Sequence, residues 1–291
     1  MHSQNRLQIC RRMLFLIVGI TVLMSSACQS AKKVSSESKK PSAKITGVHF
    51  RDLSMDALTL LFDIEVTNPY SVSLPLANLE YGLSSNGQQF VDGMAGLRES
   101  IPAGQSKTVS VPVEIGFMEA LRALDQIRPG SIVPYKAEMA LSVNGPGDQT
   151  IRLPLTREGS LPIPSIPSLS LKELRWSELS LDEAKGTLRL HLVNQNEFPV
   201  DLSGMFYRLA LGDKEVASAK VQQSAKFAEK GGEGDLEIPV SFSPKKLGLA
   251  VFQMLMGAEA GYSLDGTMDM QTPYGPIPMP FTSVGKMPFR K

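Results

Sequence analysis

The chain has 291 residues, of which 42% are hydrophobic and 20% charged, and its formal net charge at pH 7 is +1. This composition supports packed cores and excludes a disordered protein, and the length suits two domains of ordinary size. The balanced charge excludes a strongly basic nucleic-acid-binding surface. Both cysteines, Cys10 and Cys28, precede residue 30, so the rest of the chain cannot form a disulfide or a cysteine-ligated metal site.

Residues 1–27 have the features of a secretory signal peptide. Arginines precede an uncharged apolar segment at 13–24, and small residues then lead to Cys28. An apolar segment of this length is too short for a bilayer core, which needs about 20 residues. The order of these features predicts export from the cytoplasm.

The small residues before Cys28 resemble the bacterial lipobox, in which the cysteine is lipidated and becomes the mature N-terminus. The lipobox prefers Leu three residues earlier, where this chain has Ser25. The resemblance implies that Cys28 carries lipid and that the Ser- and Lys-rich residues 28–43 form a flexible tether. Plain secretion and an uncleaved anchor are the alternatives. Gln29, by resemblance to enterobacterial sorting, implies an outer-membrane location facing the periplasm.

Two long segments of the chain repeat one pattern. Residues 62–83 and 188–209 align at an offset of 126 positions. Apolar and polar residues alternate in both, which is typical of half-buried antiparallel strands. Two later strands, which contain Pro112 and Pro239, also align. Because proline lacks the amide donor, we expect these later strands at sheet edges or bulges.

A helix follows in each repeat. Residues 117–130 carry apolar residues at helical spacing, and Gly130 is a typical helix end. In the second repeat, Ser243 and Pro244 are typical of an N-cap and a first helical turn. We therefore expect one amphipathic helix per repeat, with its apolar face in the core.

Each repeat closes with a hairpin. Turn-forming residues at 144–148 and 271–275 separate its two strands. Many short strands with turn signals predict a mainly β fold of two tandem β-sandwiches, residues 44–161 and 168–290. The prolines of residues 158–170 predict a semi-rigid linker between them.

Asparagine and proline mark a corner after the first repeated strand. Asn68 and Pro69 occupy it in the first repeat, and Asn194 and Pro199 in the second. Asparagine bonds its own backbone and proline fixes φ, so we interpret these residues as a structural corner that sends the chain to the opposite sheet. The alternative for Asn68 is a ligand contact.

Four tyrosines occupy matching core-side positions: Tyr81, Tyr135, Tyr207 and Tyr262. We expect them to pack in the cores with their hydroxyls bonded at the rim. The alternative is that the phenols reach a ligand cavity between the sheets.

The sequence has no recognisable catalytic or metal-binding constellation. His2 belongs to the signal peptide, and His49 and His191 alternate with apolar residues, so they should point to solvent. No nucleophile elbow or phosphate-binding glycine pattern is present. We therefore expect a protein that is not an enzyme and needs no metal or cofactor.

The motifs of the first repeat resemble the WHy domain of the type-2 late embryogenesis abundant proteins. These motifs are VTNP (66–69), LEYGL (79–83) and VPV (111–113), followed by a helix and a hairpin. The second repeat lacks the Asn-Pro pair. The resemblance implies immunoglobulin- or fibronectin-III-like sandwiches with one helix each, and a role in water stress.

These observations lead to two functional hypotheses. The first is a membrane-tethered, non-enzymatic lipoprotein that protects against desiccation, with partly unfolded client proteins as partners. The alternative is a periplasmic binding or assembly module for an apolar ligand or an envelope protein partner, which should have a lined pocket. A structural spacer also fits the tandem repeat. Neither hypothesis involves nucleic acid.

Overall fold

The structure is a computed structural model that describes residues 40–125, 127–147 and 149–290. The predicted signal peptide, Cys28 and the predicted tether up to residue 39 lie outside the described residues. From Pro41 onward the chain forms one compact unit, which contains both repeats. In the described chain, no helix has both the length and the apolar character needed to cross a bilayer.

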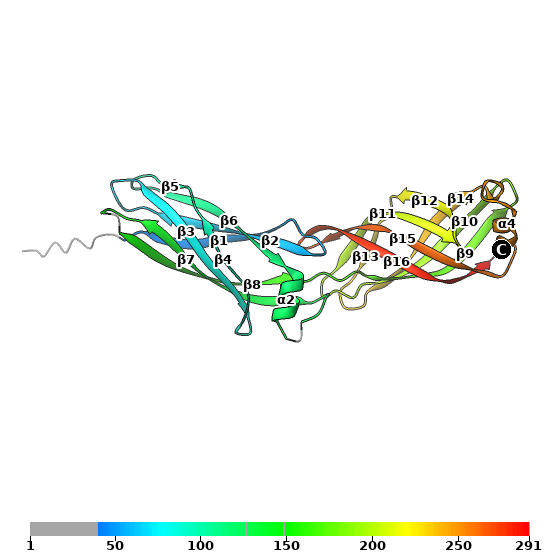
Figure 1. The fold of residues 1–291 in the computed structure, drawn as a ribbon, viewed down its shortest axis with the longest axis horizontal. Coiled ribbons are helices and arrows are strands. Elements are labelled where there is room, and N and C mark those ends of the chain that lie inside the picture. The colour runs from blue at the N-terminus through cyan, green and yellow to red at the C-terminus, as the bar shows by residue number, and fades with distance from the viewer. Residues whose placement is uncertain (1–39, 126, 148, 291) are drawn as a thin grey trace, which may run out of the picture. The chain divides into compact units, whose positions relative to one another are not determined.

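The first domain consists of two antiparallel sheets (Figure 1). One sheet has the strand order β1-β2-β6, and the other has the order β4-β3-β7-β8 with β5 beside β3. The elements are β1 (Ser42–Arg51), β2 (Ala57–Thr67), β3 (Leu74–Ser85), β4 (Gln88–Gly96), β5 (Ser100–Ile101), β6 (Ser106–Gly116), α2 (Phe117–Ala123), β7 (Ile132–Asn144) and β8 (Thr150–Pro162).

The second domain repeats this topology strand by strand. Its strands run β12-β11-β15-β16-β9-β10-β14 with β13 beside β11, and a short parallel pairing of β16 with β9 joins the two layers. The elements are β9 (Ser168–Leu179), β10 (Ala184–Val193), β11 (Val200–Leu211), β12 (Lys214–Val221), β13 (Ala225–Phe227), β14 (Glu233–Phe242), α3 (Pro244–Leu247), α4 (Leu249–Leu255), β15 (Glu259–Thr272) and β16 (Gly275–Arg290).

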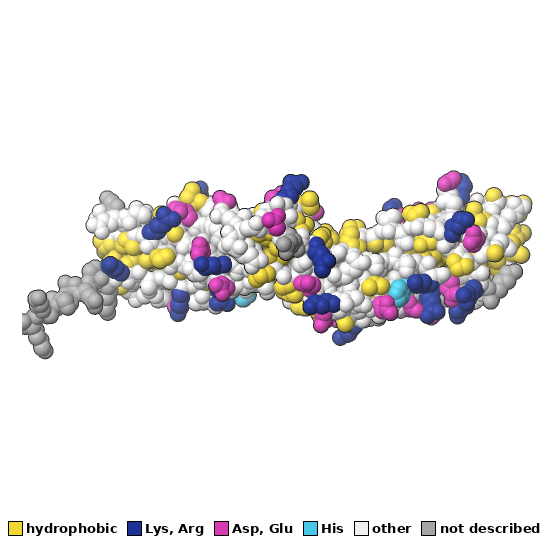
Figure 2. Space-filling model, turned by 90° about the horizontal axis from the view of Figure 1, so that it is seen from below, with side chains coloured by type: hydrophobic (Ala, Val, Ile, Leu, Met, Phe, Trp, Pro, Cys, Tyr) yellow, Lys and Arg dark blue, Asp and Glu magenta, His cyan; other side chains and the backbone are white. Residues whose placement is uncertain are grey.

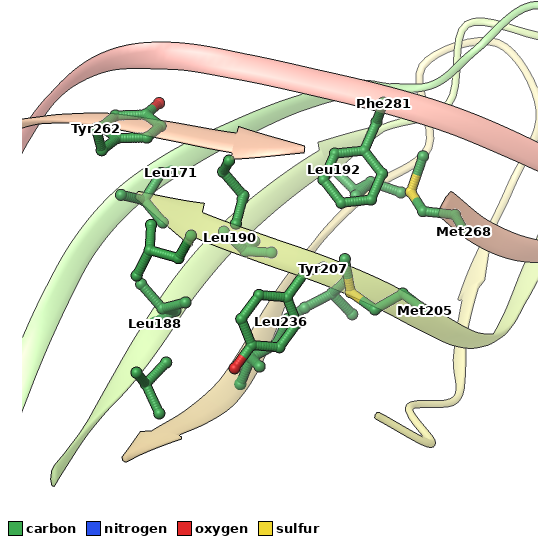
Figure 3. Close-up of a cluster of buried hydrophobic side chains, with 14 of the residues drawn as sticks. Leu171, Leu188, Leu190, Leu192, Met205, Tyr207, Leu236, Tyr262, Met268 and Phe281 are labelled. Atoms are coloured by element: carbon green, nitrogen blue, oxygen red, sulfur yellow. The ribbon is translucent and has the colours of Figure 1, made fainter. Parts of the chain in front are cut away.

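Alternating apolar residues build a core between the two sheets of each domain. In β2, every second residue from Leu58 to Val66 is buried, and the intervening residues face outward. The same alternation in β10 buries Leu188, Leu190 and Leu192. Figure 3 shows these leucines facing Met205 and Tyr207 of the opposite sheet. The two-residue period therefore produces the mainly β fold of two tandem sandwiches that the sequence predicts.

The helices are shorter than the sequence predicts. α2 ends at Ala123 because Leu124 adopts extended dihedral angles, φ −114° and ψ 118°, and its side chain is buried. In the second domain, Gly248 has a φ of +104° and separates α3 from α4. Ser243 makes no side-chain capping bond. The first repeat therefore has the one helix that the sequence predicts, shortened where Leu124 is buried, whereas in the second repeat the backbone of Gly248 divides the predicted helix into two.

The linker is also shorter than its composition suggests. β8 continues to Pro162 and β9 begins at Ser168. Ile163 is buried, and it bonds to Gly130 and Ser131 through its backbone. The predicted linker over residues 158–170 is thus wrong at both ends, because its apolar residues contribute strands and core packing.

The two strand prolines lie where the sequence predicts them. Pro112 is in β6 and Pro239 is in β14, and each of these strands is at the edge of its sheet. At an edge the missing amide donor leaves no partner strand unsatisfied.

Candidate functional site

Asn68 is the centre of a hydrogen-bonded corner between β2 and β3. Its side chain is fully buried. Its Nδ2 donates to the backbone oxygens of Val72 at 2.8 Å, Ile101 at 3.0 Å and Pro102 at 3.1 Å. Its Oδ1 accepts from the backbone N–H of Tyr70 at 2.9 Å. With both ends of the amide engaged, this geometry favours the structural corner over a ligand contact.

Asn194 forms the same corner in the second domain. It is fully buried, and its Nδ2 donates to the backbone oxygens of Phe198 at 2.9 Å and Ala228 at 3.0 Å. These acceptors lie 126 positions after Val72 and Pro102. The corner thus has the same bonding scheme in both repeats.

The second corner has an additional buried asparagine. Asn196 replaces Tyr70 at the equivalent position, and its backbone N–H donates to Asn194 Oδ1 at 3.0 Å. Its side chain accepts from the N–H of Ser165 at 2.7 Å and donates to the Ser165 oxygen at 3.0 Å. This corner therefore also fixes the segment between β8 and β9. The sequence places Asn196 within the corner at 194–199 but does not indicate its bonds to Ser165, which lies 31 residues earlier.

The prolines lie beside these asparagines without taking part in the side-chain bonds. Pro69 is half-buried directly after Asn68, and Pro199 is exposed directly before β11. The asparagine amide is therefore the common element of the two corners, while the proline position differs between them.

The four predicted core tyrosines are not equally buried. Tyr135, Tyr207 and Tyr262 are buried, and burial raises the pKa of Tyr135 and of Tyr207. Tyr207 donates to the Pro239 oxygen at 3.4 Å, and Tyr262 shares a hydrogen bond of 2.9 Å with Ser283. Tyr81 also packs against the first core, but it is only half-buried. The reason is that its neighbouring strand, β4, is at the sheet edge and offers little cover.

Three of these rings lie across a glycine of the neighbouring strand. Tyr81 is opposite Gly93, Tyr135 is opposite Gly159, and Tyr262 is opposite Gly285. A Cβ at Gly93 would lie 2.5 Å from the Tyr81 hydroxyl, and one at Gly159 would lie 2.7 Å from that of Tyr135. The tyrosine ring covers the backbone where the glycine has no side chain, as aromatic residues do beside strand glycines. A glycine inside an alternating strand was the sequence signal for these pairs.

The outward face of the first domain holds a small polar cluster around Asp63. Its carboxylate accepts from Ser110 Oγ at 2.5 Å and lies 3.0 Å from His49 Nε2. The bond from Ser110, followed by the proximity of His49, lowers the pKa of Asp63.

Asp235 forms a comparable cluster in the second domain. Its Oδ1 lies 2.8 Å from His191 Nδ1, and its Oδ2 accepts from Arg189 Nε at 2.9 Å. The bonds from His191 and then Arg189 lower the pKa of Asp235. Across the described ranges no three His, Cys, Asp or Glu side chains gather closely enough for a metal ion. We interpret the clusters around Asp63 and Asp235 as surface ion pairs, which stabilise a fold only weakly.

The two domains define a protein of tandem β-sandwiches, each with an asparagine-centred corner. The family model for late embryogenesis abundant protein, LEA_2, matches residues 63–159 and 189–285, one region in each domain. Because these regions cover more than half of the chain, the chain belongs to this family. The family resemblance drawn from the VTNP, LEYGL and VPV motifs is thus confirmed.

Individual relatives each match a stretch about as long as one domain. The chain is 26% identical to the "Desiccation protectant protein Lea14 homolog" of Glycine max, over 45% of this chain and 86% of that protein. It is 24% identical to the "Late embryogenesis abundant protein Lea14-A" of Gossypium hirsutum, over 45% and 87%. The solution structure of AT1g01470 from Arabidopsis thaliana aligns at 22% identity with a TM-score of 0.37, over 44% of this chain and 85% of that chain.

Proposed function

We propose that this protein protects other macromolecules during water loss without catalysing a reaction. The observation that carries the proposal is the family match in both domains, together with relatives whose names describe desiccation protection. A duplicated domain presents two copies of the protecting surface on one chain.

The packing of the domains is compatible with a protective role for a folded protein. Tyr207, Phe62, Phe198 and Phe227 are fully buried and fill space between the sheets. On the face that Figure 2 shows, acidic and basic side chains are interspersed with apolar ones. A stable domain with such a mixed surface can separate partly unfolded proteins from one another as water is removed.

We further propose that lipid on Cys28 holds the protein at the envelope, on the periplasmic side of the outer membrane. The support is the apolar segment and the small residues before Cys28. Mass spectrometry of the mature protein should show an acylated N-terminal cysteine, and Cys28→Ser should release the protein from the membrane fraction. An unmodified Cys28 in a membrane-bound protein would contradict this anchor.

A second candidate is the binding of a small apolar ligand. A shallow groove beside the start of β9 is lined mostly by apolar residues, among them Ile166, Pro167, Leu169 and Phe281. Native mass spectrometry of the purified protein separates the candidates, since a carrier should retain a lipid-sized molecule.

The test of the protective function is a drying experiment. All strands and both cores lie after Pro41, so residues 29–291 contain the whole folded unit. A labile enzyme is dried and rehydrated with this chain, or with an inert globular protein of equal mass. The proposal expects clearly more recovered activity with this chain. Equal recovery at equal molar ratio would contradict it.

A further inference from the structure

Several edge strands of the described domains carry proline. β6 and β14 contain Pro112 and Pro239, and β8 contains Pro154. β16 pairs with β9 only at Phe289 and Arg290, and its earlier part contains proline at alternate positions, Pro276, Pro278 and Pro280. The edge strand β1 has no proline but carries Lys44 and Arg51. Proline removes amide donors from an edge and so prevents another strand from pairing with it. These edges are therefore closed to strand addition.

The edge strand β4 lacks such protection. It is at the end of the sheet β4-β3-β7-β8. Its sequence, QQFVDGMAG, has no proline and no lysine, and Asp92 is its one charged residue. The side chain of Met94 is 65% exposed on it. Gln88 at the start of β4 bonds Asp125, and α2 contacts the strand. The later residues of β4 leave a row of backbone donors and acceptors open to pairing.

The equivalent edge of the second domain is protected by charge. β12 is also at the end of its sheet, and its residues lie 126 positions after those of β4. Lys220 stands where β4 has Met94, and Lys214 and Glu215 stand where β4 has Gln88 and Gln89. Charged residues, lysine above all, block edge-to-edge pairing. The two strands differ along their whole length, and the exchanges include three charged residues gained in β12 and one charge lost, where Ser218 stands at the position of Asp92.

The core-facing side of β4 leaves apolar surface at the rim. Val91, Gly93 and Ala95 alternate along this side, and each is half-exposed. The half-buried ring of Tyr81 lies across Gly93. A strand added beside β4 would place every second side chain next to these small residues and would cover the ring. The rim thus favours an occupant with apolar residues at alternate positions.

The outer side of the same edge is acidic. The residues that line a shallow hollow beside β4 include Gly82 and the three acidic residues Glu80, Asp92 and Glu138. Arg152 is the basic residue at this hollow and is ion-paired with Glu80. Glu138 is ion-paired with Lys136, so Asp92 supplies the remaining negative charge of the hollow. This carboxylate favours a lysine or arginine on the outward face of an added strand.

We propose that β4 is a docking edge that pairs with an extended segment of a partly unfolded protein. The segment has apolar residues at alternate positions and a basic residue on its outward face. This inference rests on the proposed protective function and gives that function a contact surface. Pairing occupies the backbone of a client segment that would otherwise pair with another client chain.

Binding of a defined peptide tests the docking edge directly. The probe is a short fluorescein-labelled peptide of alternating Val and Thr with Lys at a Thr position and at both ends. Anisotropy is measured with residues 29–291 of the protein. A second peptide carries N-methyl groups on alternate backbone amides, which removes the pairing donors and keeps the side chains. We expect the first peptide to bind and the methylated peptide to bind at least about tenfold more weakly.

Three variants separate the edge from general hydrophobicity. Met94→Lys copies the charge of the second domain onto β4 and should weaken binding at least about tenfold. Val284→Lys removes a more exposed apolar side chain, 73% exposed on β16, and should leave binding unchanged. Lys220→Met should strengthen binding by opening the edge of β12. Circular dichroism confirms that each variant is folded.

The outcomes distinguish this inference from the proposed function. No binding by the unaltered protein, equal binding of the methylated peptide, or equal binding by Met94→Lys would overturn the docking edge. A dimer in sedimentation that Met94→Lys dissociates would also overturn it, because the occupant would be a second copy. If the peptide binds in this pattern but drying gives no protection, the docking edge stands and the protective function fails. If drying gives protection but the peptide does not bind, the protective function stands and the docking edge fails.

Discussion

At the scale of single residues, the buried asparagine amides hold the fold together more than the prolines beside them. Asn68 and Asn194 use both ends of the side-chain amide to bond backbone groups of two separate loops. A buried backbone carbonyl that loses its donor costs free energy, since no water replaces the bond. The same amide in both repeats explains why the second repeat folds alike without an Asn-Pro pair.

Substitution of Asn68 should therefore be strongly destabilising. Asn68→Ala leaves buried backbone groups unsatisfied and should lower the free energy of unfolding by about 2–4 kcal/mol. Asn68→Asp should cost at least as much, because a carboxylate cannot donate to those carbonyls. Urea denaturation measures both. Gln105→Ala is the matched control, since Gln105 is exposed and binds Asn68 through its backbone oxygen. If Gln105→Ala lowered the free energy of unfolding as much as Asn68→Ala, this account of the corner would be contradicted.

Asp235 should make stability depend on acid pH. Its pKa in the folded protein is lowered by His191 and Arg189, below the value of about 3.9 of an unfolded chain. A carboxylate with a lowered folded-state pKa stabilises the fold above the unfolded pKa, and this stabilisation is lost as pH falls through the folded pKa. Wild type should thus be more stable than Asp235→Asn at pH 6, with the difference vanishing toward pH 2. A difference that grows on acidification would contradict the direction of the shift. NMR titration of the carboxyl carbon gives the pKa itself.

At the scale of elements, pairs of a tyrosine and a glycine link neighbouring strands. The Tyr135 ring on β7 occupies the space that a side chain at Gly159 on β8 would need. The tyrosine ring therefore fits only if the residue opposite it on the neighbouring strand is glycine, even though the two residues are far apart in the sequence. The contact between the tyrosine ring and the glycine has two results: it buries the phenol, and it covers the glycine backbone.

Gly159→Ala should reveal this link. Its Cβ would lie 2.7 Å from the Tyr135 hydroxyl, so the ring must move, at a cost of about 1–3 kcal/mol. Gly261→Ala in β15 should be neutral or stabilising, because a Cβ there meets no atom within 4 Å. Thermal unfolding compares the two. Adding Tyr135→Leu to Gly159→Ala should recover part of the loss, whereas simple additivity of the two changes would mean that the residues do not interact.

At the scale of the whole molecule, stability arises from two cores without covalent cross-links. The buried residues of each core come from its own repeat. Leu53 packs against both cores, and Met55 and Ile132 of the first repeat pack against the second core. Both cysteines precede residue 30, so residues 29–291 have no thiol. Burial of apolar surface is the main source of stability in such a domain.

Reducing agent should consequently leave the thermal unfolding of residues 29–291 unchanged. Dithiothreitol acts on thiols and disulfides, and this part of the chain has neither. Differential scanning calorimetry with and without dithiothreitol is the measurement. A lower melting temperature in dithiothreitol would contradict the view that core packing alone stabilises this part of the chain.

The sequence by itself determined the strands, the repeat at 126 positions, the edge positions of Pro112 and Pro239, and the family. These follow from side-chain alternation and proline chemistry, which act within a strand or between adjacent strands. Only the tertiary structure decided where α2 ends, that Gly248 separates α3 from α4, that Asn196 fixes Ser165, and that Tyr81 is half-exposed beside an open β4. Each of these depends on atoms far apart in the chain, because burial and hydrogen bonding are set by spatial neighbours and not by local period.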